Sequence, residues 1–392
     1  MKNKVALGLF EDVDYDLLSP LSYLRPVYEL KTGMFSNRER LERIFVDYKY
    51  CLFSRDFLSG LLKWRLNIVM GKTNVYVNEL IKGYDILLIN GRILLNESLI
   101  ESLRELVEVA GNVVGLHNSN IVVLRLTSSV AEKFKSVLIK PFHLELLGDL
   151  EGSADILEIE ATLVNSPKDL LRAFNNQLRL DFRLANIEQS SIQEGSKVSE
   201  DVTFDDREGP VVVLRDSKLS DSMIKGPAFI GNNVTVLGSD IDNSIIGDDS
   251  KIIDSVVRNS IIMDHVTIHG GCYISNSIIG SFSKVMPLAC LCGERISQYE
   301  WKRGGEFVIV GDYCTIGPGA IVYPGVNIGA FSAIHGNCEE DVKSFELATG
   351  TIRRKLTLKE VMKLAQIRSR EVNKFISDYE LSSIKRLYEE LL

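Results

Sequence analysis

Hydrophobic and polar positions recur with a period of six between Val310 and Glu339. The first position of each hexapeptide is aliphatic: Val310, Ile316, Val322, Ile328 and Ile334. The fifth position is small or of modest size: Cys314, Ala320, Val326, Ser332 and Cys338. A helix has a period near 3.6 and a strand a period of 2, so a period of six is typical of a β-solenoid whose repeats bury their apolar faces on one another. We therefore expect the aliphatic positions to stack into an inner ladder, with the fifth positions sharing the interior.

A looser form of the same repeat begins near Ile192. Ile230, Ile246 and Ile262 are sixteen residues apart, and Ile279 follows after seventeen. An Asn-Ser dipeptide precedes the last three of these: Asn243-Ser244, Asn259-Ser260 and Asn276-Ser277. Three hexapeptides make a triangular coil of about eighteen residues, so the shorter spacing predicts one shortened corner per coil. We assign residues 187–345 to this β-helix. Residues 291–309 interrupt the repeat and predict a loop that contacts a ligand or another subunit.

Residues 1–183 instead alternate between strand-like and helix-like segments. The expected strands are VALGLF, YDILLING and IVVLRL, and the expected helices are SNRERLERIF, NESLIESLRELVEVA and TSSVAEKFKSVLI. Ser36 and Glu39 have the spacing of a capping box at the first of these helices. This alternation predicts a doubly wound, largely parallel sheet, in which ligands bind at the carboxyl ends of the strands. The loops after Phe10, Asn90 and Val164 are therefore the expected site.

Two further helical regions are predicted. Ser166 as the cap, Pro167 at the first helical position and Asp169 in the first turn predict a helix that leads out of the α/β domain. Residues 346–392 form a helical extension with apolar faces on two helices: Leu358, Val361, Met362, Ala365, Val372, Phe375 and Ile376, then Leu381, Ile384, Tyr388 and Leu391. Thr357 and Glu360 have the spacing of a capping box at the first of these two helices. Because a solenoid needs a covered end, we expect this extension to cap the coil.

Composition narrows the class of protein. The formal net charge is −8, and Lys and Arg are spread along the chain without a basic stripe, which argues against nucleic acid as a partner. No apolar run reaches the length of a membrane span or of a signal-peptide core. We expect a cytoplasmic protein. Cys272, Cys314 and Cys338 occupy fifth positions, where a small buried residue fits.

The order of these parts resembles the sugar-1-phosphate nucleotidyltransferases with a C-terminal left-handed β-helix, a group that includes the bifunctional N-acetylglucosamine-1-phosphate uridylyltransferases. The segments that carry the resemblance are PLSYLRPVYELKTG, LLING, VNSPKDLLRA and the hexapeptide coil, and they are most similar to a compact, divergent branch of that superfamily. The resemblance implies transfer of a nucleotide from an NTP to a sugar-1-phosphate with Mg²⁺ as the cofactor. It also implies the left hand of the coil and a homotrimer or larger homo-oligomer.

The matching positions differ from the family's pattern at the site. Where the family has a glycine-rich loop that holds phosphates, this chain has EDVDYDLLSPLS, without glycine. Arg92 stands in place of a metal-binding aspartate, and Asn165 matches the second metal position. Candidate roles are phosphate contact and catalysis for Arg25 and Arg92, substrate contact for Asn90, Gly91 and Arg38, and metal binding for Asn165. Carboxylates of the first loop are alternative metal ligands: Asp12, Asp14 and Asp16.

Two other functions stay open beside nucleotidyl transfer. The altered loop and Arg92 fit a catalytically degenerate module that binds a nucleotide or sugar phosphate for regulation or scaffolding. The coil fits an acyltransferase that takes acyl-CoA and uses a histidine as the general base. The candidate bases are His265, His269 and His335.

Overall fold

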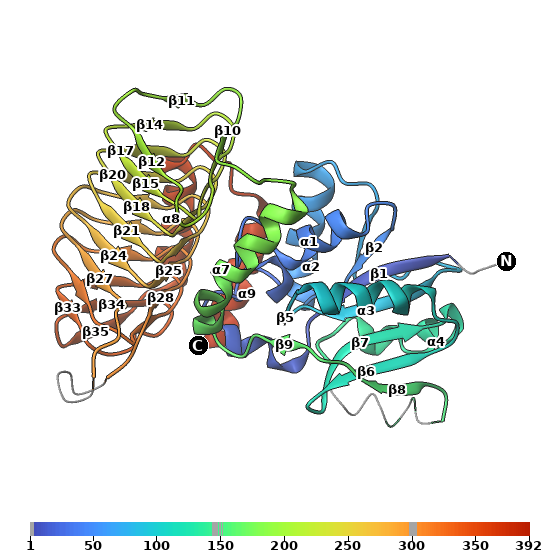
Figure 1. Ribbon diagram of the computed structural model, residues 1–392. Helices are drawn as coiled ribbons and strands as arrows, with labels where there is room; N and C mark the ends of the chain where they lie inside the picture. The colour runs from blue at the N-terminus through green and yellow to red at the C-terminus, as the bar shows by residue number, and fades with distance from the viewer. Residues whose placement is uncertain (1–3, 143–147, 149, 151, 298–303) are drawn as a thin grey trace. The chain divides into compact units, whose positions relative to one another are not determined.

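The computed structural model describes residues 4–142, 148, 150, 152–297 and 304–392 (Figure 1). The chain packs as two compact units. The first comprises Met1–Leu18, Leu24–Lys31 and Phe35–Ser166, and the second comprises Ser19–Tyr23, Thr32–Met34 and Pro167–Leu392. Each unit is described by itself below.

The first unit is built on one mixed β-sheet with the strand order β3-β2-β1-β4-β7-β6-β8. Its strands are β1 (Val5–Phe10), β2 (Tyr50–Leu52), β3 (Val75–Val77), β4 (Asp85–Asn90), β6 (Val113–His117), β7 (Asn120–Leu126) and β8 (Asp155–Glu158). Strands β1 to β4 run parallel, and β7 pairs antiparallel with both β4 and β6. Continuous apolar stretches such as DILLIN form β4, which is buried along its whole length. The predicted α/β sheet is confirmed, with β7 as its antiparallel member.

The reason for β7's direction is a tight turn. Residues Asn118 and Ser119 both have left-handed backbone angles, with φ of 47° and 66°, and join β6 directly to β7 as a hairpin. The sequence pattern predicts β7 but not β6. Without β6, the alternation of strands and helices predicts that β7 runs parallel to its neighbours. The short strands β2 and β3 were also missed, because runs of three residues are too brief to show a period.

The helices of the first unit are α1 (Asn37–Ile44), α2 (Asp56–Lys63), the π-helix η3 (Trp64–Val69), α3 (Glu97–Glu108), α4 (Ser128–Lys133) and α5 (Lys135–Leu138), with 3-10 turns η1 (Val13–Leu18) and η2 (Val27–Glu29). Two of these helices, α1 and α3, begin at side-chain caps, and α2, η3, α4 and α5 begin without one. The capping box of Ser36 and Glu39 at α1 is present in both directions. Asn96 caps α3 through its side chain. A short antiparallel pair, β5 (Ile93–Leu94) with β9 (Thr162–Leu163), brings the chain after β4 next to Val164.

The continuous part of the second unit begins with α7 (Pro167–Leu184), which starts at the predicted proline, and continues as a parallel β-helix. Among its described residues, short strands form three sheets that repeat in turn along the chain. The first sheet contains β10 (Ser191–Ile192), β13 (Val211–Val213), β16 (Ala228–Ile230), β19 (Ile245–Ile246), β22 (Ile261–Ile262), β25 (Ser277–Ile279), β28 (Val308–Val310) and β31 (Asn327–Ile328). The second contains β11 (Lys197–Val198), β14 (Lys218–Ser220), β17 (Thr235–Leu237), β20 (Lys251–Ile253), β23 (Thr267–Ile268), β26 (Lys284–Val285), β29 (Thr315–Ile316), β32 (Ala333–His335), β34 (Glu346–Thr349) and β35 (Ile352–Lys355). The third contains β12 (Thr203–Asp205), β15 (Met223–Lys225), β18 (Asp240–Asp242), β21 (Val256–Arg258), β24 (Tyr273–Ser275), β27 (Cys290–Cys292), β30 (Ile321–Val322) and β33 (Asn337–Cys338).

The six-residue period explains the core of this coil. Ile230, Ile246, Ile262 and Ile279 are direct partners in successive strands of the first sheet, and the ladder continues through Val310. Ile316 and Val322, which begin the next hexapeptides, lie in the second and third sheets. The aliphatic positions therefore form one ladder per sheet. The cysteines at fifth positions are buried as predicted, at 0 to 2% exposure.

The repeated Asn-Ser dipeptide forms one corner of the coil. Asn243, Asn259 and Asn276 all have φ between 43° and 46°, a left-handed conformation that asparagine tolerates better than most residues. The serine that follows has its backbone amide bonded to the hydroxyl of the equivalent serine one coil earlier, as for Ser260 to Ser244 and Ser277 to Ser260, at 3.1 Å each. The dipeptide is thus a structural repeat.

Another corner, which we call the aromatic corner, carries left-handed residues that change from polar to aromatic along the coil. They are Asn233, Asp249, His265, Phe282, Tyr313, Phe331 and Phe345, with φ from 52° to 65°. From His265 onward the rings stack, with centroids 4.5 to 5.5 Å apart. Stacking and burial offset the steric cost of this backbone conformation.

The C-terminal segment starts with a hairpin and continues as two helices. Residues 346–355 form β34 and β35, which extend the second sheet, so the helical extension begins later than predicted. Helix α8 (Leu358–Glu371) has the predicted capping box of Thr357 and Glu360, and α9 (Asp378–Leu391) follows. Their contacts reach from Asp249 to Phe345, so the helices lie along the coil and not across its end.

Two predicted members of the apolar helix faces were wrong: Phe375 and, at 41% exposure, Leu391 at the end of α9. Phe375 is 83% exposed, because α8 ends at Glu371 and Asn373, with φ of 55°, turns the chain before Phe375. Val361, Ala365 and Ile384 are buried as predicted.

The loop predicted at 291–309 leaves the coil between β27 and β28, and its residues 298–303 lie outside the described residues. The described ends of this loop make a hydrogen bond and an ion pair to other residues of the second unit. The hydroxyl of Tyr273 donates to Glu294 at 2.9 Å, and Arg172 of α7 pairs with Glu306.

Candidate functional site

A buried polar network lies at the carboxyl ends of β1 and β4, where the sheet predicts a site. Arg92, just after β4, has a side chain with 0% exposure. Its Nε and Nη2 atoms donate to both oxygens of Asp12, just after β1, at 2.6 to 3.0 Å. Nη2 also donates to Asp14 at 2.8 Å, and Nη1 donates to the side chain of Asn165 at 2.6 Å and to the carbonyl of Val164 at 3.2 Å. The loops after Phe10, Asn90 and Val164 therefore meet at Arg92.

Asn90 and Gly91 support this network from the strand end. The Asn90 amide donates to Asp12 at 2.7 Å and to the carbonyl of Ile121 at 2.9 Å, and its oxygen accepts from the backbone N–H of Arg92 at 2.9 Å. Asn90 has 0% exposure, so its polar atoms are used inside the domain. A Cβ at Gly91 would lie 2.8 Å from the Val27 side chain and 3.0 Å from the Phe10 carbonyl, which explains why glycine is required here. The predicted substrate residues of this strand end thus have clear packing roles.

A second buried ion pair lies beside the network and was missed from the sequence. Glu11 accepts from Arg55 through both carboxylate oxygens, at 3.1 Å each, and from the backbone N–H of Val27 at 3.0 Å. Glu11 directly follows β1, and Arg55 follows β2. Because β2 was not predicted, Arg55 could not be placed at the carboxyl edge of the sheet, although Glu11 could have been.

The other two predicted arginines differ in their surroundings. Arg38 of α1 is buried and pairs with Glu29 and, at 2.9 Å, with Glu42. Burial opposes its charge, but the carboxylates of Glu29, Glu39 and Glu42 raise the pKa of Arg38 above its ordinary value, so it is a permanently charged structural group. Arg25 is partly exposed, and its carbonyl accepts from Arg55 at 2.8 Å. The backbone of Arg25 is thus fixed to the same edge of the domain.

The residues of the network do not fit the Mg²⁺ that the resemblance implies. Asp12, Asp14 and Asn165 do gather oxygen atoms at one point, as a magnesium site needs. The centre of that point is occupied by the guanidinium of Arg92, which is covalently part of the chain. Across the part of the chain that the structure describes, no group of three or more His, Cys, Asp or Glu side chains is arranged to hold a metal ion.

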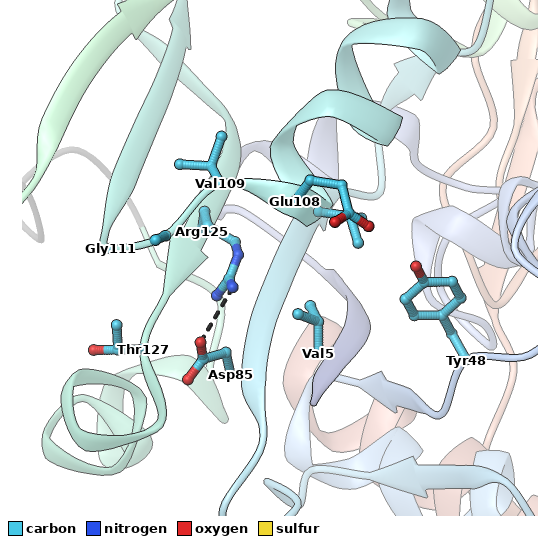
Figure 2. A pocket seen from close by; sticks show the side chains of 10 residues that line it. Val5, Tyr48, Asp85, Glu108, Val109, Gly111, Arg125 and Thr127 are labelled. Atoms are coloured by element: carbon cyan, nitrogen blue, oxygen red, sulfur yellow. Dashed lines mark hydrogen bonds and ion pairs between the residues drawn. The ribbon is translucent and has the colours of Figure 1, made fainter. Parts of the chain in front are cut away.

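A pocket of about 380 Å³ lies at the opposite, amino end of the parallel strands (Figure 2). It is lined by Val5 of β1, Asp85 of β4 and the residues after α3, and Figure 2 shows Arg125 paired with Asp85 at 3.1 Å on its wall. Asp85 also accepts from the backbone N–H of Ser128 at 2.8 Å, so this pair fixes the start of α4. None of the predicted site residues lines this pocket.

The three candidate histidines of the coil occupy different environments. His265 stacks on Phe282 in the aromatic corner, and burial lowers its pKa despite nearby Asp264 and Asp249. His269 follows β23 and is partly exposed; burial and then Lys284 lower its pKa. His335 ends β32 and is exposed. The first two lie on one coil, and His335 lies several coils further along.

Two family models match parts of the chain and agree with its fold. Residues 7–190 match the family model described as sugar nucleotidyl transferase. Residues 209–295 match the model described as GlmU-like, C-terminal hexapeptide. The chain therefore joins a sugar nucleotidyltransferase-like domain to a GlmU-like hexapeptide region. The network around Arg92 lies within the sugar nucleotidyltransferase-like domain, and His265 and His269 lie within the matched hexapeptide region.

Solved structures give weaker likenesses to this chain. A crystal structure of the polySia specific acetyltransferase NeuO has 16% identity and a TM-score of 0.27, and the match covers 45% of this chain and 94% of that one. A hexapeptide transferase family protein from Anaplasma phagocytophilum has 18% identity and a TM-score of 0.21, with 45% and 89% covered. No curated protein matches the chain in sequence. None of the helices in the described ranges is long and apolar enough to cross a membrane.

Proposed function

We propose that this protein is a sugar-1-phosphate nucleotidyltransferase, which converts an NTP and a sugar-1-phosphate into an NDP-sugar and pyrophosphate. The observation that carries this proposal is the meeting of Asp12, Arg92 and Asn165 at the carboxyl ends of β1 and β4. These residues come from the segments that match the sugar nucleotidyl transferase family. In open α/β sheets this edge is where ligands bind.

The reaction brings two polyanions together, because an oxygen of the sugar-1-phosphate attacks the α-phosphate of the NTP and pyrophosphate leaves. Positioning and neutralisation of charge are therefore the main tasks of the protein. We assign phosphate contact to Arg25, which is partly exposed and whose backbone is held by Arg55. A guanidinium binds phosphate through two parallel hydrogen bonds, which orients it as well as attracting it. Asn90 and Gly91 shape the strand end beneath the substrates.

The test is pyrophosphate release by the full chain with NTPs paired with common sugar-1-phosphates. We expect release with one pair, and a loss of at least roughly tenfold in Arg25→Ala, the effect of losing one charge-assisted contact to the reacting phosphates. Arg104→Ala is the matched control, because Arg104 is an exposed arginine of the same domain paired with Glu101. Absence of release with every pair, or equal loss in both variants, would refute the assignment.

A second candidate is a non-catalytic module that binds a nucleotide or sugar phosphate. The observation in its favour is that Arg38, Arg55 and Arg92 are all paired with carboxylates of the same domain. Cations that are already fixed in pairs with carboxylates add little stabilisation to the charge that develops during transfer. Thermal stabilisation by an NTP or a sugar phosphate without pyrophosphate release would favour this function over transfer.

For the coil, we propose acyl transfer from acyl-CoA with His269 as the general base. His269 is partly exposed and has a lowered pKa, which keeps its imidazole neutral near pH 7. His265 is engaged in the aromatic corner instead. Consumption of acetyl-CoA with an amino-sugar phosphate, lost in His269→Asn, tests this activity. A cytoplasmic homotrimer or larger homo-oligomer is part of the same proposal, and light scattering of the purified chain measures its size.

A further inference from the structure

The hydrogen bonds of Arg92 account for the whole guanidinium group. A guanidinium has five N–H donors. In Arg92, Nε bonds to Asp12, Nη2 bonds to Asp12 and Asp14, and Nη1 bonds to Asn165 and to the carbonyl of Val164. The side chain has 0% exposure. Arg92 therefore has no donor left over and no surface to present to a phosphate in this arrangement.

The group is also held in place from behind. Asn90 accepts from the backbone N–H of Arg92 and donates to Asp12, so one amide fixes both partners of the ion pair. The pair β5 and β9 then places Asn165, two residues after β9, beside Arg92. The acceptors around the guanidinium are positioned by the strand ends and, for Asp14, by the 3-10 turn η1. The arrangement is a preformed cation site, and the cation in it is the guanidinium of Arg92.

The charges of Asp12, Asp14 and Arg92 disfavour the binding of a divalent metal ion at this point. Asp12 and Asp14 contribute two negative charges and Arg92 one positive charge. A divalent ion that joined them would meet a fixed guanidinium within a few ångströms, and two cations so close repel strongly in a buried site. A divalent ion that replaced Arg92 would leave a buried arginine without its partners, which is strongly unfavourable.

We infer that Arg92 is a built-in substitute for a protein-held divalent cation. Its guanidinium joins Asp12, Asp14 and Asn165, and these groups bind no Mg²⁺. Because Asp12 directly precedes η1 and Asp14 lies in its first turn, Arg92 also fixes the segment that stands in place of the family's glycine-rich loop. The inference rests on the proposed function only for the location of the site, because its test uses the metal alone.

The experiment compares the full wild-type chain with Arg92→Asp in MgCl₂ and in MnCl₂, without any nucleotide. In the wild type we expect no metal-dependent change in Tm and no Mn²⁺ bound at Asp12 by electron paramagnetic resonance. In Arg92→Asp the site becomes rich in carboxylates, so we expect a lower Tm without metal. Saturating Mg²⁺ should then raise that Tm by about 5 °C, the size expected when the metal exceeds its Kd a hundredfold.

Two controls separate this effect from general loss of a buried arginine. Arg125→Asp removes a buried arginine that pairs with one carboxylate, Asp85, and should lose Tm without recovery in Mg²⁺. Adding Asp12→Asn to Arg92→Asp should abolish the recovery. A well-folded Arg92→Asp that does not respond to metal would refute the inference.

If Arg92→Asp does not fold, Mn²⁺ binding by the wild-type chain still tests the inference. Mn²⁺ binding to the wild-type chain that disappears in Asp12→Asn would overturn it, and the absence of such a site would support it. Neither outcome depends on transfer activity, so failure of the proposed function and failure of this inference are distinguishable.

Discussion

Glu11 and Arg55 form a two-pronged ion pair in the interior of the sugar nucleotidyltransferase-like domain. Nε and Nη2 of Arg55 each lie 3.1 Å from a different oxygen of Glu11, and the Glu11 side chain has 0% exposure. The same carboxylate accepts from the backbone N–H groups of Val27 and Arg55. One side chain thereby joins the end of β1 to the segment after β2 and to η2.

We predict that Glu11→Ala strongly destabilises the domain. The change leaves Arg55 buried without its partner and leaves two backbone N–H groups without an acceptor, which costs roughly 3–5 kcal/mol. Urea unfolding measures the loss. Glu101→Ala removes an exposed partner of Arg104 and should change stability by less than about 0.5 kcal/mol. Similar losses in the two variants would show that the buried pair has no special role.

In the coil, we predict that Phe331→Ala costs about 3–5 kcal/mol, the usual range for a buried aromatic residue. Phe331 has 0% exposure and stacks between Tyr313 at 4.6 Å and Phe345 at 5.5 Å. Phe375→Ala is the matched control, because Phe375 is 83% exposed. The midpoint of chemical denaturation should fall clearly in the first variant and stay unchanged in the second.

His265 should make the stability of the coil depend on pH. Burial lowers its pKa in the folded state, so below about pH 6.5 the unfolded chain binds more protons at this residue than the folded chain does. Its contribution is therefore fully present above the unfolded pKa and is lost as the pH falls, with a slope of at most about 1.4 kcal/mol per pH unit. The groups around the ring are Phe282, Asp248, Asp249, Asp264 and Lys374.

The measurement is the unfolding free energy of wild type and His265→Phe between pH 5 and 8. Phenylalanine fits the left-handed backbone here, because Phe282, Phe331 and Phe345 occupy the same position in later coils. We expect the variant to lose less stability than wild type between pH 7 and 5. Parallel profiles for the two chains would assign the pH dependence to other groups.

Ser260→Ala tests the role of the Asn-Ser dipeptide. The Ser260 hydroxyl accepts from the backbone N–H of Ser277 at 3.1 Å and donates to the carbonyl of Arg258 at 2.6 Å. Without it, the buried N–H of Ser277 loses its acceptor, at a cost of about 1–3 kcal/mol. Ser102→Ala removes an exposed hydroxyl of α3 and should have little effect on the urea midpoint. A loss below that of Ser102→Ala would contradict the structural role.

The parts of the fold that were predictable are those with a strong local signal. The spacing of sixteen and seventeen residues predicted that Ile230, Ile246, Ile262 and Ile279 occupy equivalent positions, and the capping boxes at Ser36 and Thr357 located two helix starts to the residue. Strand β2, the hairpin of β6 with β7 and the end of α8 were not predicted. Their bounds depend on tertiary pairing and on backbone angles at single residues such as Ser119 and Asn373, which a hydrophobic pattern does not report.

The candidate site shows the same division. Motif positions located Asn90, Arg92 and Asn165, and the structure brings them into one network with Asp12. The sequence could not show that the guanidinium N–H groups of Arg92 hydrogen-bond to Asp12, Asp14 and Asn165, because these residues are far from Arg92 along the chain. The pairing of Glu11 with Arg55 was hidden for the same reason.

The side chain at the aromatic corner differs between most successive coils of an otherwise repetitive β-helix. Lys374 pairs with Asp249, Glu380 accepts from the hydroxyl of Tyr313, and Tyr388 packs on Phe345. The segment that contains the two C-terminal helices therefore contacts the aromatic corner in three different coils. A shift of these helices by one coil, about 4.8 Å, would place Lys374 opposite Asn233 or His265 and Glu380 opposite Phe282 or Phe331, so both polar contacts would be lost. The residues of the corner therefore specify the position along the β-helix at which the two C-terminal helices dock.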